Sequence, residues 1–467
     1  MTLPTATSRR LLPRVAPSSE IAGQLYDLIA DRPIISPHGH VDPRILVDDQ
    51  PFRDPAALLI RDDHYITRLL HADGVPLDEL GIGEGDLDPG VARRIWRLFC
   101  ERWHLFAGTA SGYWLRSTLT DVFGIDRIPG EADADDLFDE ISGALERPEM
   151  RPRALLERFR LSVLATTDAP LDDLDAHRRL AADASVATSV LPTFRPDAYL
   201  DPLTSGWGER VERLLASTGE SGYRGYLRSL EHHRRRFIEH GAVSADFGVL
   251  SAQTLEMPEA DAGRLFERAR AGELDEDGAR AFLANMLWQS ARMSVEDGLV
   301  MTLHAGVLRN HHTPSFHAFG ADRGHDIPVS TTFAEPLRPL LHSFGTAPGF
   351  HLVLFTVDET TYSREIAPLA GFYPSVFIGA PWWFLDAPDS ALRFRSATVE
   401  TAGFYRGSGF IDDTRAFLSI PVRHDMARRT DAAHLARLIA EERVTLSEAE
   451  RIALDLQDAI PRRAFKL

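Results

Sequence analysis

The segment Pro33-Ile34-Ile35-Ser36-Pro37-His38-Gly39-His40-Val41-Asp42-Pro43 places two histidines, one residue apart, behind a short apolar run near the N-terminus. The apolar run predicts a β-strand with the histidines at its carboxyl end. Because side chains alternate between the faces of an extended chain, His38 and His40 point the same way and can bind one cation. The spacing predicts a metal site, although two hydrogen-bonded strand-end histidines would give the same pattern.

Length and composition set the limits of the interpretation. The 467 residues can bury a large core, as one large α/β domain or two smaller ones. A net charge of -18 argues against nucleic acid as a partner, so an anionic substrate would need a local group of arginines. No apolar run reaches membrane-spanning length and the start lacks a signal peptide, which predicts a cytoplasmic protein without a membrane partner. Cys100, the only cysteine, is assigned to packing.

Lysine is almost absent from the chain. Of the 51 basic residues only Lys466 is a lysine, and it is the penultimate residue. This argues against Schiff-base chemistry and against the carboxylated lysine that bridges two metals in many barrel hydrolases. A mononuclear metal site is therefore favoured.

Short apolar runs bounded by turn residues recur along the chain. They predict parallel strands buried on both faces. Helical periods at 223–239 and 279–293 supply crossover helices between them. The alternation predicts a distorted (β/α)8 TIM-type barrel with its chemistry at the carboxyl ends of the strands, and leaves a doubly wound open sheet as the alternative. The runs are 161–167, 189–194, 300–305, 351–357, 375–379 and 409–411.

A stretch without a convincing strand interrupts this alternation after the first strand. Helical periods at 56–72, 91–106 and 113–123 predict a helical insertion subdomain at residues 46–154. The barrel would then comprise residues 18–45 and 155–467, with helix from Arg423 to the end.

Carboxylates follow the last apolar run, in Phe410-Ile411-Asp412-Asp413-Thr414-Arg415. An acidic residue here could complete a His/His/Asp site, which leaves coordination positions open for water or substrate, as a catalytic metal requires. A helix N-cap explains Asp412 or Asp413 equally well.

Taken in order, the motifs of this chain resemble the uronate isomerase family of the amidohydrolase superfamily. The resemblance spans nearly the whole chain. It rests on His38-x-His40 with Asp42-Pro43, Asp63-His64-Tyr65, Thr166-Thr167-Asp168, Leu191-Pro192-Thr193-Phe194-Arg195-Pro196-Asp197, Leu303-His304-Ala305-Gly306 with Arg309-Asn310, Trp382-Trp383-Phe384, Asp413-Thr414-Arg415 and Arg423-His424-Asp425.

The resemblance implies isomerisation of D-glucuronate to D-fructuronate and of D-galacturonate to D-tagaturonate. His38, His40 and Asp413 resemble ligands of one zinc ion, and Asp413 is also a candidate for moving the proton. Tyr65 and His64 match a segment that reaches the site from the insertion, and both are candidate catalytic residues, with Tyr65 as a proton-transfer partner. The substrate-binding candidates are Arg195, Arg415, His304, Trp383 and Arg423.

The chemistry of an aldose–ketose isomerase suits this inventory independently. Moving a carbonyl between neighbouring carbons requires an acid/base group and a cation or aimed donors that stabilise the enediol intermediate. A substrate carboxylate calls for the planar fork of an arginine. Each candidate also has a structural interpretation, since His64, Tyr65, His304 and Trp383 could simply pack, and Arg415 could pair with a neighbouring aspartate.

The substrate, the reaction class and the need for a metal each remain open. Members of the family usually carry Ser-Asp-His-Gly where this chain has Ala245-Asp246-Phe247-Gly248, so Phe247 predicts a lost site contact and leaves another sugar acid open as substrate. A mononuclear metal-dependent hydrolase acting on a small anionic substrate would use the same ligands, and a non-catalytic sugar-acid binding barrel is the third hypothesis. Whether the metal is obligatory stays open, because hydrogen-bond donors can also hold an enediolate. A symmetric homo-oligomer is expected.

Overall fold

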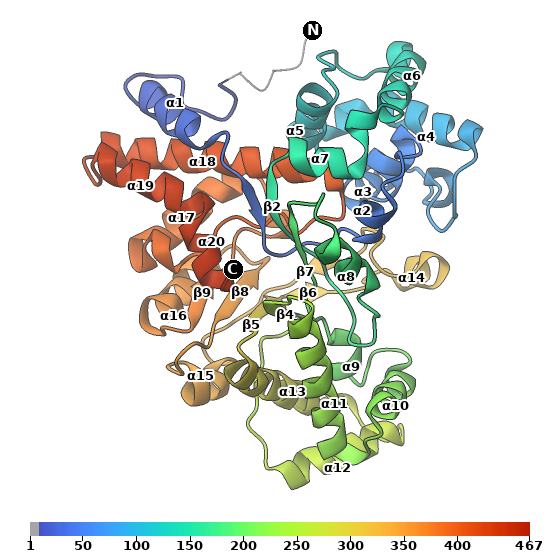
Figure 1. The fold of residues 1–467 in the computed structure, drawn as a ribbon, viewed down its shortest axis with the longest axis vertical. Coiled ribbons are helices and arrows are strands. Elements are labelled where there is room, and N and C mark those ends of the chain that lie inside the picture. Colours follow the sequence, from blue (N-terminus) through green and yellow to red (C-terminus); the bar gives the residue numbers. More distant parts are fainter. Residues whose placement is uncertain (1–8) are drawn as a thin grey trace.

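A computed structural model describes residues 9–467 of the chain (Figure 1). Within these residues seven strands pair in parallel, in two sheets with the orders β1-β2-β3 and β4-β5-β8-β9. A short antiparallel pair, β6 with β7, lies outside them. The strands are β1 (Ile34–Ser36), β2 (Leu161–Ala165), β3 (Ser189–Leu191), β4 (Ser244–Val249), β5 (Val300–Ala305), β6 (Val307–Leu308), β7 (Ile327–Pro328), β8 (Leu352–Thr356) and β9 (Val376–Ile378).

Backbone hydrogen bonds join the two sheets beyond the end of β3. Phe194 N–H donates to Ser244 O at 3.2 Å, and Asp246 N–H donates to Phe194 O at 2.9 Å. The seven strands therefore follow one another in chain order with a common direction. Their carboxyl ends lie on one side, which is where the sequence predicted the chemistry.

The stretch between β9 and the C-terminal helices lies beside both outer strands. Ser408 N–H donates to Ile378 O of β9 at 2.9 Å, and His40 N–H, just beyond β1, donates to Thr414 O at 3.0 Å. The strand predicted at 409–411 is nevertheless wrong, because none forms there. Gly409 has φ +77° and Asp413 has φ +44°, and such left-handed residues interrupt a strand ladder.

Helices surround the strands and supply the connections between them (Figure 1). β5 and β8 are buried at every position, as expected for parallel strands covered on both faces. The helices between β2 and the C-terminal helices are α8 (Asp175–Ala182), α9 (Asp197–Leu200), α10 (Trp207–Thr218), α11 (Gly222–Glu239), α12 (Glu259–Arg270), α13 (Glu276–Asp297), α14 (Thr313–Phe319), α15 (Arg338–Phe344), α16 (Ala367–Phe372) and α17 (Pro388–Ala402).

Helices fill the long connection between β1 and β2, where the sequence predicted an insertion. Their apolar residues form one core with Ile34 of β1, Leu161 and Leu164 of β2, and Phe417. The connection therefore packs directly on the first two strands. Its helices are α2 (Arg44–Asp48), α3 (His64–Ala72), α4 (Pro89–Glu101), α5 (Ala110–Ser117), α6 (Ala134–Leu145) and α7 (Pro152–Arg158).

The helix predicted at 56–72 is broken in the middle. A π-helical turn at Ala57–Arg61 ends at Asp62, and α3 begins afresh at His64. The Asp63 side chain accepts the Tyr65 N–H at 2.9 Å and caps the new helix. A side chain that binds the backbone locally competes with a continuous helix, so His64 and Tyr65 start a helix instead of lying within one.

The chain ends in helices, as predicted. The last three are α18 (Ile420–Ala440), α19 (Leu446–Gln457) and α20 (Ala459–Phe465), and α1 (Ser18–Ile29) packs on α18 and α19, so the blue and red parts of Figure 1 lie together. Among residues 9–467, no helix combines the length and the apolar character needed to cross a membrane.

Candidate active site

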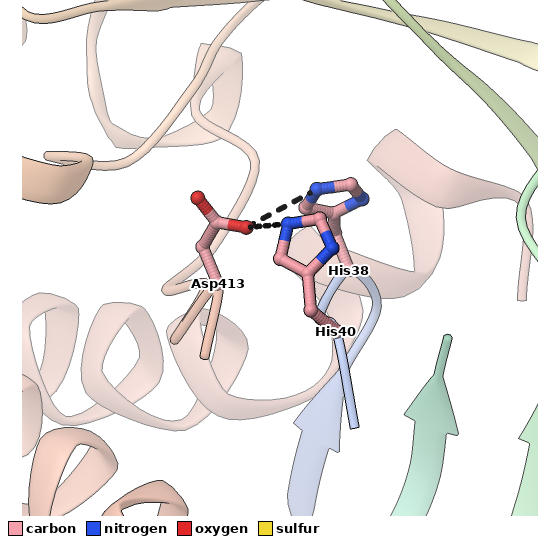
Figure 2. Close-up of side chains that lie close together, drawn as sticks. All are labelled: His38, His40 and Asp413. Atoms are coloured by element: carbon pink, nitrogen blue, oxygen red, sulfur yellow. Dashed lines mark ion pairs between the residues drawn. The ribbon is translucent and has the colours of Figure 1, made fainter. Parts of the chain in front are cut away.

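Two imidazoles and one carboxylate meet beyond the end of β1. His38 Nε2 lies 3.3 Å from Asp413 Oδ1, and His40 Nε2 lies 2.8 Å from the same oxygen. Figure 2 shows both rings pointing at this oxygen, with the histidines rising from β1 and Asp413 from the C-terminal part of the chain. The alternation of side chains in His38-Gly39-His40 therefore brings the two predicted histidines to one point.

The donor set fits a divalent cation. Asp413 Oδ1 is buried and makes no well-aligned hydrogen bond within the described chain, although two ring nitrogens face it. Ligand atoms about 2.0–2.2 Å from one cation lie roughly 3 to 3.5 Å apart, close to the distances observed. Burial lowers the pKa of His40 to about 4, whereas in His38 burial is outweighed by Asp246 and Asp413, which raise the pKa above its ordinary value. A ring must be neutral to bind a cation, so metal binding would release a proton from His38. Burial alone would raise the pKa of Asp413, but His40 and His38 hold it well below its usual range.

Asp246 is a site residue that the sequence interpretation missed. Its Oδ1 accepts from Thr302 Oγ1 and from His304 Nδ1, both at 2.7 Å, and its Oδ2 lies 3.4 Å from Arg195 Nη1 and 3.9 Å from His38 Nε2. Because a carboxylate only accepts, Nδ1 of His304 carries the proton and Nε2, which has no hydrogen-bond partner in residues 9–467, is left for a ligand. Asp246 thus orients His304 beside the cluster of His38, His40 and Asp413.

The structure also corrects the expectation for Phe247. Successive residues of β4 face opposite sides, so Asp246 and Gly248 line the cavity while Phe247 is fully buried in the apolar core. The replacement of the family's usual histidine at this position therefore removes no contact with the cavity. The signal for Asp246 was present in the same motif, as a carboxylate between two apolar residues.

His64 and Tyr65, at the start of α3, reach the cavity from the insertion. Their rings stack with centroids 4.7 Å apart, and the Tyr65 ring meets Trp114 edge-on at 5.5 Å. Burial, with Arg415 nearby, lowers the pKa of His64 to about 3, and its Nε2 has no partner among the described residues. Burial raises the pKa of Tyr65 above its ordinary value. His64 is therefore a neutral imidazole and Tyr65 a neutral phenol.

The three predicted arginines lie in different surroundings. Arg195 donates through Nε to Asp197 Oδ2 at 2.8 Å and faces Asp246. Arg415 is exposed and pairs with Asp322 at 2.9 Å, not with the neighbouring Asp412 or Asp413. Both of these arginines line the cavity.

Arg423 lies behind the cavity wall and does not line the cavity. It is 1% exposed, donates to Asp386 Oδ2 at 2.9 Å and to Asp412 O at 3.2 Å, and stacks on the Trp114 ring at 3.7 Å. Its guanidinium also lies 5.3 Å from the Tyr65 ring centroid. In this geometry Arg423 supports Tyr65 and the backbone beside Asp413, and the substrate contact proposed for it has no direct path.

One cavity of about 1220 Å³ unites the remaining candidates. It lies at the carboxyl ends of the parallel strands. Of the residues predicted from sequence it is lined by His38, His40, His64, Tyr65, Arg195, His304, Trp383, Asp413 and Arg415.

The fold and the site together define an α/β protein with a His/His/Asp cluster that could hold a metal ion at the carboxyl ends of its parallel strands. Comparison with known proteins identifies the family. The family model described as glucuronate isomerase matches residues 14–459. The uronate isomerase of Corynebacterium efficiens is 50% identical, over 98% of this chain and 98% of its own length.

Solved structures of a glucuronate isomerase and a uronate isomerase have the same fold as this chain. The crystal structure of glucuronate isomerase from Caulobacter crescentus has a TM-score of 0.96 and 42% identity, covering 100% of this chain and 98% of the other. The uronate isomerase of Thermotoga maritima has a TM-score of 0.92 at 28% identity, covering 99% and 100%. The chain belongs to the glucuronate isomerase family.

Proposed function

We propose that this chain interconverts hexuronate aldoses and ketoses, D-glucuronate with D-fructuronate and D-galacturonate with D-tagaturonate. One observation carries the proposal beyond family membership: the centre at which His38 and His40 meet Asp413 opens into a cavity that Arg195 and Arg415 also line. Such a cavity offers acid/base groups at one end and guanidinium groups for a carboxylate in an otherwise acidic protein.

His38, His40 and Asp413 would hold one divalent cation, zinc in our proposal. When bound, the cation supplies positive charge that stabilises the negative oxygen developing in the enediol stage. His304, with its Nε2 free, and His64 are placed to bind substrate hydroxyls. Trp383 covers one wall of the cavity and would pack on the apolar face of the sugar.

The proton transfer is assigned to Asp413 and Tyr65. Asp413 is ionised and can take the proton from the carbon beside the carbonyl. Asp413 would then return this proton to the neighbouring carbon. Tyr65 keeps its proton in the resting enzyme, because burial raises its pKa, and can donate it to the carbonyl oxygen. It would regain a proton from the hydroxyl that becomes the new carbonyl, so Asp413 moves the carbon-bound proton and Tyr65 the oxygen-bound one.

The fold of this enzyme is, in our proposal, a distorted (β/α)8 barrel. The segment 407–414, bonded to β9 at Ser408 and to His40 beyond β1, would take the place of the eighth strand. Residues 18–45 and 155–467 would form the barrel and 46–154 the helical insertion subdomain. We further propose a symmetric homo-oligomer that acts in the cytoplasm on a free sugar acid.

The test is turnover of D-glucuronate and D-galacturonate by the purified metal-loaded enzyme, followed by ketose formation and by mass spectrometry of the product. The wild type should yield ketose of unchanged mass, and His38→Ala and Asp413→Asn should lower kcat at least about a hundredfold and lose bound metal. His232→Ala, at an exposed histidine of α11, is the matched control and should behave as wild type. Two product fragments, or folded metal-loaded protein without ketose from either sugar, would contradict the proposal.

A further inference from the structure

One carboxylate at the rim of the cavity joins two arginines from different parts of the chain. Asp322 Oδ2 accepts from Arg415 Nη2 at 2.9 Å, and its Oδ1 accepts from Arg309 Nη1 at 3.3 Å. All three residues line the cavity. Burial alone would raise the pKa of Asp322, but Arg415 and Arg309 lower it below its ordinary value, so the bridge is ionic.

The segment that carries Asp322 is fixed at both ends. Arg309 is also held by Asp326 Oδ2 at 3.0 Å, and Asp326 Oδ1 accepts the Asn310 N–H at 2.6 Å. Gly324, at φ +87°, sits against α3 so closely that a Cβ there would lie 2.7 Å from Arg68 Cβ. The position of Asp322 is therefore set by its own loop and by the helix that begins with His64.

The bridge connects to several of the site candidates. The Arg309 guanidinium lies over the Trp383 ring at 4.8 Å, and Trp383 meets the His64 ring edge-on at 5.5 Å. Asp322 provides the one hydrogen bond that the described part of the chain makes to the exposed Arg415 side chain. Without Asp322 that side chain would be free to sample many rotamers.

We propose that Asp322 is a positioning residue that aims Arg415 and Arg309 at the carboxylate of the sugar acid. The inference rests on the proposed function, because it assigns the carboxylate end of the same cavity. An ion pair between the half-buried Asp322 and the exposed Arg415 is partly screened by solvent and contributes little to stability, so its value lies in orientation. A guanidinium already held in place loses less conformational entropy when it binds a second carboxylate, which lowers the KM of a charged substrate.

The experiment measures kcat and KM for D-glucuronate in the wild type, Asp322→Asn and Asp322→Ala. It also measures the binding of D-glucuronamide, the neutral isostere of the substrate, as competitive inhibition. If Arg415 and Arg309 lose their orientation, the substrate carboxylate loses about one charge-assisted hydrogen bond, so KM should rise roughly tenfold. We expect kcat within about twofold of wild type and an unchanged inhibition constant for the amide. Gly324→Ala, which displaces the same segment from α3, should raise KM in the same selective way.

Asp135→Asn is the matched control. Asp135 also bridges two arginines, Arg93 and Arg97, but none of the three lines the cavity, and its replacement should leave both constants unchanged. An equal loss of uronate and amide binding would reduce Asp322 to a structural role and overturn the inference. A lowered KM in Asp322→Asn would also overturn it, since Asp322 would then compete with the substrate. If the wild type forms no ketose the proposed function fails, whereas ketose formation with unchanged Asp322 variants refutes this inference alone.

Discussion

Replacing Phe247 by histidine, the residue usual in the family, tests which face of β4 carries this side chain. Phe247 is fully buried in the core on the helix side of the sheet, opposite Leu303 of β5, and its neighbours Asp246 and Gly248 face the cavity. If this register is right, Phe247→His restores no contact with substrate. The variant should therefore keep kcat and KM within about twofold of wild type, and its cost should fall on stability alone.

The cost follows from the burial. Burying a phenylalanine side chain contributes about 1.5–3 kcal/mol, and a ring nitrogen left without a partner costs about 1–3 kcal/mol. We expect Phe247→His to be less stable by about 3 kcal/mol. An unfolding entropy of about 2.1 cal/mol/K per residue is roughly 1 kcal/mol/K for 467 residues, so the thermal midpoint should fall by about 3 °C.

Scanning calorimetry and steady-state kinetics on the same preparations decide the matter. Phe247→Leu is the matched control, because it keeps an apolar side chain and should lose only about 1 kcal/mol with unchanged kinetics. A tenfold change in kcat/KM for Phe247→His, or a midpoint equal to that of wild type, would mean that this side chain faces the cavity and would refute the assignment of Phe247 to the core.

Three further predictions concern buried charges. Asp246→Asn should lower kcat or metal affinity roughly 10- to 100-fold, because the variant lacks the negative charge that Arg195, His304 and His38 face. Steady-state kinetics and metal analysis measure the loss. Unchanged kcat and metal content would exclude a role for Asp246 in the site. Arg423→Met should destabilise the protein by about 3–5 kcal/mol by leaving Asp386 buried and unpaired, and the double variant with Asp386→Leu should recover most of the thermal midpoint. Burial raises the pKa of Asp168 to about 6 in the folded protein, so folding favours the protonated carboxyl. The stability that this carboxyl contributes is therefore complete below pH about 4 and is lost as the pH rises through about 6. Asp168→Asn should thus be more stable than wild type at pH 7, by at most about 3 kcal/mol, and equal to it at pH 4; a pH series of thermal midpoints measures the difference, and a gain that persists at pH 4 would contradict the assignment.

Burial on both faces made some strands predictable and hid others. β5 is buried throughout and apolar at four of its six positions, and its bounds Val300–Ala305 follow from the sequence alone. β4 carries Asp246 and Gly248 on its inner face, so its sequence lacks the apolar run by which the other strands were found. The apolar run at 409–411 misled for the opposite reason, since left-handed residues there prevent strand pairing.

The site was predictable where it depends on local spacing. His38 and His40 converge because they are two apart on an extended chain, and that rule needs no tertiary information. The role of Asp246 depends on its neighbours across the sheet, which spacing does not reveal. Arg423 could not be placed because the side of α18 that faces inward is set by packing against Trp114 and Tyr65.

The backbone adds a last argument that these residues form a working site. Ten non-glycine residues in the part of the chain that the structure describes have positive φ, and four of them line the cavity: Asn310, Asp322, Trp383 and Asp413. Aspartate and asparagine tolerate this region, but for a side chain as large as Trp383 it is a costly conformation, at about 1–3 kcal/mol. Such strain persists only where the surroundings fix the backbone. Here the fixed backbone carries three side chains to which we assign roles: Asp413 as a proposed metal ligand, Trp383 as a wall of the cavity and Asp322 as the bridge between Arg309 and Arg415.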